Sequence, residues 1–320
     1  MPRLLGFVLR QVGSALLTVL VSAVLVFSAL HLVPGNYVDV LLGPQATPAE
    51  RAAAVSEYGL DRSIVVQFAT WMGNLLRGDL GTSLRSGEPV LTEILDRAPI
   101  TLELAALGCL FTVLPGIALG VCGGIAARRR TAAATRLGNA LLLSLPEILV
   151  GGVLVVLITT YVVPFTVGVW PDPFTDPAGN LAAAVPPAIV ISLFGAGFLM
   201  ATTRRAVATV LREPYVRADE IRGVGARTVY RRHLWRNISA PVVTVVGVYL
   251  ASVLTGAAIA EQMFALNGIG SYLVSAADQR DYPVVQGMVL VVTVVFVLIN
   301  MIIDILYGVI DPRIGRRGTA

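Results

Sequence analysis

Few side chains in this 320-residue sequence combine a reactive type with surroundings suited to chemistry. Three acids, Glu147, Glu261 and Asp304, stand inside or beside long apolar runs. A charge at the centre of a bilayer costs about 2.5 to 3.5 kcal/mol on insertion scales, so an acid there is a functional candidate by default. For Glu147 three alternatives remain open: contact with the amino group of a substrate, protonation, or pairing with a neighbouring subunit.

A second group of candidates lies in an arginine-rich stretch, residues 204–240, between two apolar segments. Its acids are Glu213, Asp219 and Glu220. Gly223 and Gly225 separate two short helical patterns, which predicts a helix, a turn and a second helix. The mixture of charges suits docking on a protein, while fixing topology and binding lipid headgroups is the alternative. Nucleic-acid binding is not expected, because few aromatic residues accompany the arginines.

Several classes of chemistry are excluded by what the sequence lacks. Every one of the 24 basic Lys and Arg residues is arginine, so the chain has no P-loop lysine to reach nucleotide phosphates. The two histidines, His31 and His233, are far apart, and we expect no metal site. The HExxH and GxSxG motifs of hydrolases are absent, so an intramembrane enzyme is not expected.

Composition places the chain among integral membrane proteins. Its mean hydropathy is +0.78 and its charged fraction is 14%, against about 25% for soluble domains. About 20 apolar residues form a helix that crosses a bilayer. Six segments meet this length: 11–33, 101–126, 137–163, 183–203, 241–262 and 284–309. The first is too long for the apolar core of a signal peptide, so we expect it to be retained.

The distribution of arginine predicts the orientation, since cytoplasmic loops carry an excess of basic residues. Eighteen arginines fall on the side of the termini and of residues 204–240, and six fall on the other side. We therefore expect an all-α membrane protein with six transmembrane helices and cytoplasmic termini. Its predicted parts are an N-terminal helix (1–33), an external segment (34–100), a five-helix core (101–312) and a cytoplasmic tail (313–320). Within the external segment, apolar residues at helical spacing between Ile64 and Leu75 predict an amphipathic helix.

The arginine-rich stretch resembles the cytoplasmic loop of ABC-importer permeases of the dipeptide/oligopeptide class. The residues that carry this resemblance are Tyr215-Val216-Arg217, Gly223, Arg232-His233, Arg236-Asn237 and Pro241. Further blocks follow the order of the same family at 58–62, 77–83, 261–264, 268–270, 280–287, Asn300, Asp304, Tyr307 and 311–313. Together these blocks span nearly the whole chain.

The resemblance implies roles for individual residues. The loop of residues 215–236 would hold the helix that docks on an ATP-hydrolysing subunit. The residues expected to couple the two are Tyr215, Arg217, Ala218, Asp219, Glu220, Gly223 and Arg232. Glu147, Glu261 and Phe264 are expected at the translocation path or its gate, and Asn300 and Asp304 as structural polar residues. Several residues depart from the family pattern: the acid Glu147 replaces a small or apolar residue, and Asn267 stands where proline is usual. Asp219-Glu220 is unusually acidic, which predicts a basic contact on the ATPase.

The resemblance also implies partners. They are a second homologous permease, two cytoplasmic ABC ATPase domains that bind ATP and Mg, an external binding protein that delivers substrate over residues 34–100, and membrane lipid. The chain itself would be a non-enzymatic subunit without a cofactor, and di- or oligopeptides are the expected cargo. Alternatives are nickel complexes, glutathione or oligosaccharides on the same scaffold, or an ion-coupled secondary transporter that uses Glu147 or Asp304.

Overall fold

The computed structural model describes residues 2–32, 42–43, 46–57, 59–126, 131–162 and 166–310, and the fold of these residues is helical. For residues 2–5, 7, 8, 57, 131, 132, 220 and 304–310 only the backbone is described. Extended pairing within the described part is limited to one bridge, between Thr82 and Pro89. The chain divides into two compact units: Met1–Pro99 with Gly268–Leu298, and Ile100–Asn267 with Ile299–Ala320.

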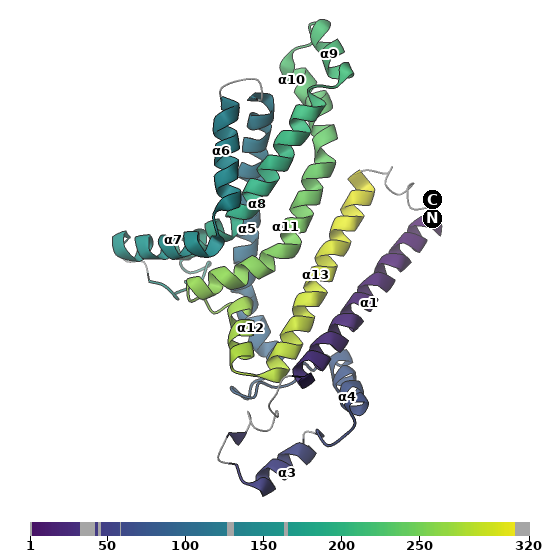
Figure 1. The fold of residues 1–320 in the computed structure, drawn as a ribbon, viewed down its shortest axis with the longest axis vertical. Helices are drawn as coiled ribbons and strands as arrows, with labels where there is room; N and C mark the ends of the chain where they lie inside the picture. Colours follow the sequence, from purple (N-terminus) through teal and green to yellow (C-terminus); the bar gives the residue numbers. More distant parts are fainter. Residues whose placement is uncertain are drawn as a thin grey trace. The chain divides into compact units, whose positions relative to one another are not determined.

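Five helices in the described part are long and apolar enough to cross a membrane (Figure 1). They are α1 (Pro2–Leu32), α5 (Val90–Ile125), α8 (Pro177–Val210), the run Ala226–Met263 that contains α11 (Trp235–Met263), and α13 (Tyr282–Ile310). These helices confirm the predicted all-α, multi-pass membrane class. Each begins before its predicted segment; α5 begins at Val90, within the segment predicted to be external.

The third predicted membrane segment, 137–163, is not one continuous helix. The chain forms α6 (Thr131–Ser144) and α7 (Glu147–Tyr161), which are bent by 91° across a short break. Pro146 has extended backbone at the break, because proline lacks the N–H of the helical ladder and disfavours helix in the residue before it. The predicted segment is therefore divided at Pro146, and it counts as a sixth span if the bent pair is taken as one. Residue 163 lies outside the described part.

In the second unit, glycines on α5 let it approach α8 closely. Four of them recur on one face of α5: Gly108, Gly116, Gly120 and Gly124. A Cβ atom added to Gly120 would lie 2.6 Å from the Cβ of Thr203, and one added to Gly124 would lie 2.5 Å from the Cβ of Val207. Since real Cβ atoms do not approach so closely, any larger residue would force the two helices apart.

The apolar core of the second unit lies between α5, α8 and α11, and α8 also packs on α6 (Figure 1). α8 begins where the Asp176 carboxylate accepts a hydrogen bond of 2.9 Å from the N–H of Gly179, with Pro177 in the first turn. The buried core residues are Leu104, Ala188, Val190, Ile191, Tyr249, Val253, Ala260, Phe264 and Leu266.

The first unit contains α1, α3 (Pro48–Glu57), α4 (Ile64–Leu76), the start of α5, α12 (Ile269–Asp278) and most of α13. α4 confirms the helix predicted between Ile64 and Leu75. Two segments of this unit that are distant in sequence meet: the hydroxyl of Ser83 donates a hydrogen bond of 2.6 Å to Asp281, and the N–H of Leu84 donates one of 3.2 Å to the same carboxylate. Asp281 is buried, so these bonds connect the 77–83 block to the start of α13.

Candidate functional site

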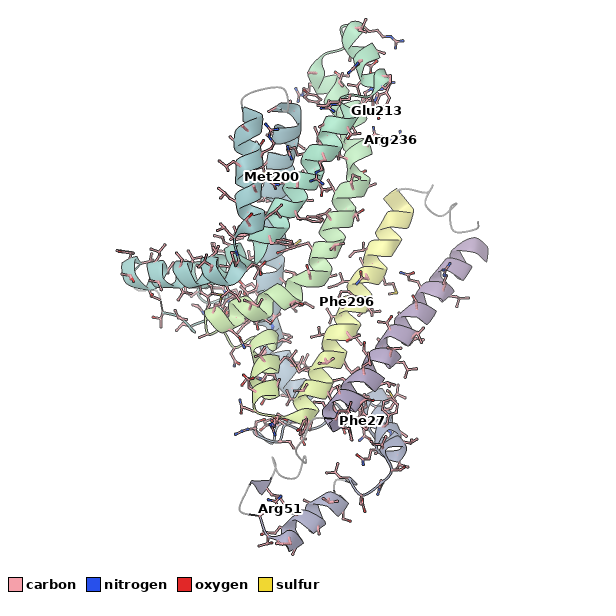
Figure 2. All side chains as sticks on the ribbon, in the orientation of Figure 1. Phe27, Arg51, Met200, Glu213, Arg236 and Phe296 are labelled. Atoms are coloured by element: carbon pink, nitrogen blue, oxygen red, sulfur yellow. The ribbon has the colours of Figure 1, made fainter. Side chains whose placement is uncertain are left out.

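The charged loop, residues 204–240, folds into a compact module at one end of the α8–α11 pair (Figure 1). After α8 the chain forms α9 (Pro214–Ile221), α10 (Ala226–Val229) and a five-residue π-helix, η2 (Tyr230–Leu234), which leads directly into α11. Figure 2 shows Glu213 and Arg236 at this end, with Met200 farther along α8. The predicted sequence of helix, turn and helix is confirmed. Isolated π-turns of this kind are frequent at functional sites.

A glycine with left-handed backbone ends α9. Gly223 has φ +76°, a conformation that costs an L-residue about 1–2 kcal/mol. The N–H of Val224 donates to the carbonyl oxygen of Asp219 at 3.0 Å, which closes the last turn as in a Schellman motif. Gly225 has φ −61° and begins α10 in ordinary extended backbone. Gly223 is therefore the position at which the turn requires glycine.

A small apolar core fastens the charged loop to α8. Val216 of α9, Val229 of α10 and Leu234 of η2 are each at most 2% exposed. The whole core comprises Val207, Val210, Val216, Val229, Leu234 and Ile238, with Val121, Ala206, Leu211, Val224 and Tyr230 packed against it. This core therefore packs α9 against both α8 and α11.

Beside this core, polar side chains of α9 and η2 bind one another. The Asp219 carboxylate lies 2.8 Å from Nε2 of His233. The ring of Tyr215 lies 5.1 Å from the His233 ring, between centroids. The amide of Asn237 donates to the His233 carbonyl at 2.6 Å and to the Tyr215 hydroxyl at 3.3 Å. These contacts fix α9 against η2 and the start of α11.

Asp219 is charged at neutral pH. The hydrogen bond from His233 lowers the pKa of the Asp219 carboxyl, and the charges of Arg232 and Arg222 lower that pKa further. Arg222 Nη1 is 3.9 Å from the carboxylate and is itself exposed. We had predicted from sequence that Asp219 contacts a base on a partner protein. In the structure its side chain is 14% exposed and already holds a base of its own chain.

The outer face of the charged loop is basic with an apolar residue at its edge. All seven arginines between residues 212 and 236 are exposed: Arg212, Arg217, Arg222, Arg227, Arg231, Arg232 and Arg236. Ile221, the last residue of α9, is 88% exposed. Tyr215 and Trp235 are also exposed. An exposed isoleucine in an arginine-rich segment is typical of a surface that binds another protein.

The predicted coupling residues divide between the two faces of this module. Arg217 and Arg232 are exposed, and Ala218 is half-buried. Tyr215 and Asp219 contact His233, which had not been singled out as a site residue. Of Glu220 only the backbone is described. The acid at 219 and the histidine at 233 were visible in the sequence, but nothing in the spacing indicated that they pair.

The two residues predicted at a gate, Glu261 and Phe264, lie near the other end of α11 and are buried. Glu261 is 0% exposed and accepts a hydrogen bond of 2.6 Å from the hydroxyl of Thr101. Phe264, 1% exposed, belongs to the main core, and its carbonyl oxygen accepts from the N–H of Gly168 at 3.0 Å. In this conformation both residues hold helices together.

A second polar contact lies at the same end of the unit. The buried Asn180 of α8 donates to the carboxylate of Glu103 on α5 at 3.2 Å and to the carbonyl of Pro171 at 3.0 Å. We call Thr101, Glu103, Asn180 and Glu261 the polar layer. It connects α5 with α8 and α11. Sequence reasoning had singled out only Glu261 of these four, because the other three are ordinary residues of apolar helices until their partners are known.

Glu147 occupies the bend between α6 and α7. It is the first residue of α7, where a negative charge is favourable to the helix dipole, and its side chain is half-buried. Its Oε2 lies 3.9 Å from the position that a Cβ on Gly256 of α11 would occupy. Asn300 is half-buried on α13. The side chain of Asp304 and residues 311–313 lie outside the described part.

The described side chains do not assemble a metal centre: across residues 2–310, apart from the gaps given above, no three of His, Cys, Asp or Glu converge. Their polar groups are instead used to fix helices to one another. Two features remain as candidate sites: the basic surface of the charged loop at one end of α8 and α11, and the buried polar layer near the other end.

Known protein families and individual relatives match this chain over nearly its full length. Residues 116–316 match the family of binding-protein-dependent transport system inner membrane components, and residues 4–105 match the N-terminal family of such membrane components. The dipeptide transport system permease of Escherichia coli K12 is 33% identical over 339 residues, covering 98% of this chain and 100% of that protein. A protein of Brucella abortus named as a peptide transport permease is 34% identical (97% and 98% covered), and the glutathione transport permease of Salmonella paratyphi A is 34% identical (97% and 99%).

Proposed function

Because this chain belongs to the family of binding-protein-dependent transport system inner membrane components, we propose that it is the membrane-spanning permease subunit of an ATP-driven importer of small peptides. The printed names of its relatives support this cargo, since dipeptides and glutathione are both small peptides. Membership of this family leaves the ion-coupled secondary transporter, predicted as an alternative, without support. Nickel complexes and oligosaccharides are less favoured as cargo, because the relatives described above are named for peptides, dipeptides and glutathione.

One observation carries the proposal for energy coupling: α9 is fastened to α8 and α11 by a core of its own, yet it presents Ile221 uncovered among arginines. A docking helix needs these two properties. It must bind a partner through an exposed apolar anchor, and it must pass the partner's movement to the membrane helices. The charged loop is accordingly the surface on which a cytoplasmic ATPase acts.

The proposed partners rest on the missing P-loop lysine and on the family to which this chain belongs. Without lysine it has no P-loop, so ATP and Mg bind to two cytoplasmic ATPase domains on other chains. An external binding protein delivers the peptide, as the family description implies. A second, homologous permease completes the membrane part, and lipid surrounds the exposed apolar faces of α1 and α7. In this complex the chain is a transport subunit without enzymatic activity of its own.

ATP binding closes the two ATPase domains and draws their docking surfaces together. Because α9 is rigid on α8 and α11, closure is transmitted as a rotation of these helices, and the complex changes from inward-facing to outward-facing. In thermodynamic terms, ATP shifts a two-state equilibrium by binding one state more tightly. The polar layer, at the far end of α11, is where this rotation opens or closes the outer gate.

Glu147 is proposed to contact the amino terminus of the peptide in transit. It is an acid at the bend of a broken helix, and such helix breaks form substrate sites in other transporters. We expect Glu147→Gln to reduce peptide uptake about fivefold while the binding protein still stimulates ATP hydrolysis fully. Uptake by this variant equal to wild type would remove Glu147 from the path.

The proposal is tested by purifying the tagged chain from its native membrane in a mild detergent. A second six-helix permease and two P-loop ATPases should co-purify with the wild-type chain. Ile221→Asp should lose the ATPases but keep the second permease, and Ile221→Leu should keep both. Since residue 221 is 88% exposed, neither variant is expected to disturb the fold. Recovery of ATPases with Ile221→Asp at the wild-type yield would contradict docking through α9.

A further inference from the structure

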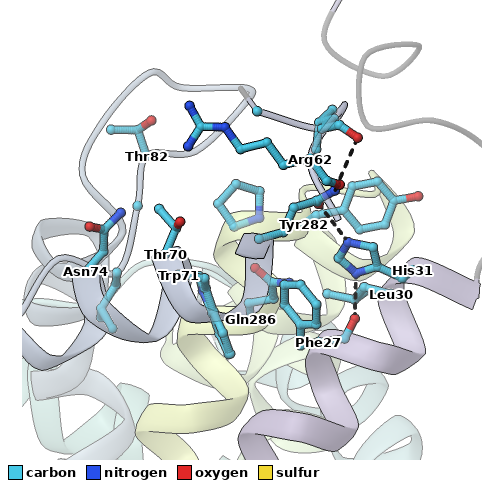
Figure 3. Close-up of a pocket in the computed structure, with 16 residues that line it drawn as sticks. Phe27, Leu30, His31, Arg62, Thr70, Trp71, Asn74, Thr82, Tyr282 and Gln286 are labelled. Atoms are coloured by element: carbon cyan, nitrogen blue, oxygen red, sulfur yellow. Dashed lines mark hydrogen bonds between the residues drawn. The ribbon is translucent and has the colours of Figure 1, made fainter. Parts of the chain in front are cut away.

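A cavity of about 480 Å³ lies in the first unit, near the C-terminal end of α1 and the N-terminal end of α13. Figure 3 shows its lining, which comes from α1, α4, α13 and the two segments 59–62 and 80–82. At the floor Phe27 is 6% and Tyr282 7% exposed, while Arg62, Thr70 and Thr82 at the rim are exposed. The cavity is thus a recess with an open mouth.

Aromatic contacts hold the walls of this recess in place. The Phe27 ring lies 5.5 Å from Trp71 and 5.2 Å from Phe68, between centroids, and thereby fastens α4 to α1. The Phe27 ring also lies 4.2 Å from the ring of His31. Because four rings from two helices interlock here, the recess is formed before any partner arrives.

Hydrogen bonds fix the polar side chains on one side of the recess. His31 places Nδ1 2.8 Å from the carbonyl oxygen of Phe27 and Nε2 3.2 Å from Oε1 of Gln67. The Gln67 amide nitrogen donates to the carbonyl oxygens of Leu60 and Arg62, which fixes Oε1 toward the histidine. These contacts hold the His31 ring in place at the side of the recess.

The positive group of the recess is Arg62, whose guanidinium extends across the mouth toward Thr82 (Figure 3). None of the residues that line the recess is Asp or Glu. The acids nearest in sequence to its 80–82 wall and its Tyr282 wall are engaged elsewhere: Asp79 accepts from the N–H of Gly81 at 2.8 Å, and Asp281 holds Ser83 and Leu84. Within the described residues no carboxylate pairs with Arg62.

The recess lies at the ends of two membrane helices that are remote from the arginine-rich termini. The positive-inside distribution therefore assigns it to the outer face. A family that depends on an external binding protein must receive that protein on this face. A cationic, aromatic-walled recess without an acid is complementary to an acidic side chain carried on a protruding loop.

We propose that this recess is a docking site for the external binding protein, and that it receives an Asp or Glu on a loop of that protein between Arg62 and the aromatic wall. The inference rests on the proposed function, because it assigns the partner implied by that function to a particular surface.

The test uses the complete transporter in lipid nanodiscs, with the purified binding protein of the same system added together with its peptide. ATP hydrolysis is measured against binding-protein concentration. Arg62→Glu should raise the half-saturating concentration at least tenfold, with the maximal rate unchanged. Arg85→Glu is the matched control: it is an exposed arginine of the same segment outside the recess, and it should shift the curve less than twofold.

A second variant guards against a local folding effect. Thr70→Trp keeps every charge and fills the mouth, so it should raise the half-saturating concentration as well. The shift caused by Arg62→Glu should diminish in high salt, and reversal of one surface acid on the binding protein should restore docking to this variant.

Curves for Arg62→Glu and Thr70→Trp within twofold of wild type would overturn the proposal. So would peptide that binds the recess directly, in the absence of binding protein, and depends on Arg62. A wild-type complex that contains no ATPase would instead refute the proposed function itself.

Discussion

In the charged loop the polar side chains that bind each other are close in sequence: Asp219 and His233 are 14 residues apart, and Tyr215 and Asn237 are 22 apart. In the polar layer, by contrast, Thr101 and Glu261 are 160 residues apart. The loop also leaves the seven arginines between residues 212 and 236 exposed, while Glu261 has no exposed surface. The first region is thus a local module that presents a surface, and the second is a contact between distant helices. Changes in the two regions should have different effects: loop variants should keep the fold of the membrane helices and lose docking or coupling, and layer variants should lose thermal stability.

The largest effect is expected from Glu261→Ala. This change leaves the buried Thr101 hydroxyl without its acceptor, at about 1–3 kcal/mol, and opens a cavity at the junction of α5 and α11. We expect peptide uptake to fall more than tenfold and the melting temperature of the purified complex to fall by several degrees. Glu261→Gln keeps an acceptor for Thr101 and should retain most of the thermal stability. Equal melting temperatures for Glu261→Ala and wild type would show that the layer does not hold the helices.

The next effect is expected at Gly223, in the loop. A valine there must adopt φ near +76°, at a cost of about 1–2 kcal/mol, so α9 would no longer end at its present position. Gly223→Val should assemble with both ATPases but show about tenfold weaker stimulation of ATP hydrolysis by the binding protein. Gly225→Val is the control, since φ is −61° there and a Cβ meets no neighbour within 4 Å. If both variants behave alike, the special conformation of Gly223 is not what coupling requires.

The smallest effect is expected from the Asp219–His233 pair. Asp219→Asn and His233→Gln should each lower coupled uptake two- to threefold, because the core under α9 still holds the helix. The double variant should lose no more than either single change, as a double-mutant cycle would reveal. Fully additive losses would mean that the two side chains act on separate partners, which is what the sequence alone had led us to expect of Asp219.

The difference between the two regions also explains what could be predicted from sequence. The helix, turn and helix of the loop were predicted correctly because Gly223 and Gly225 are local signals within a polar stretch. Pro146 indicates a kink within residues 137–163, but the size of the bend, 91°, depends on how α6 and α7 pack and could not be predicted from an average over apolar residues. The bonds from Thr101 to Glu261 and from Asn180 to Glu103 depend on which helices pack together, and no short stretch of sequence contains that information.

The same reasoning applies to the close approach of α5 and α8. Glycines at 108, 116, 120 and 124 lie on one face of α5, and this pattern is visible in the sequence. Their partner is not, because any of the apolar helices could supply the opposite face. The structure identifies it as α8 through Thr203 and Val207.

The most direct test of the central claim is a photo-crosslinking amino acid placed at position 221 in the assembled transporter. Docking on α9 predicts a crosslink from residue 221 to an ATP-hydrolysing subunit, and none from residue 248, which is exposed on α11 within the membrane. A crosslink from position 221 only to lipid, in a preparation where the ATPases co-purify, would contradict the assignment of the charged loop as the coupling surface.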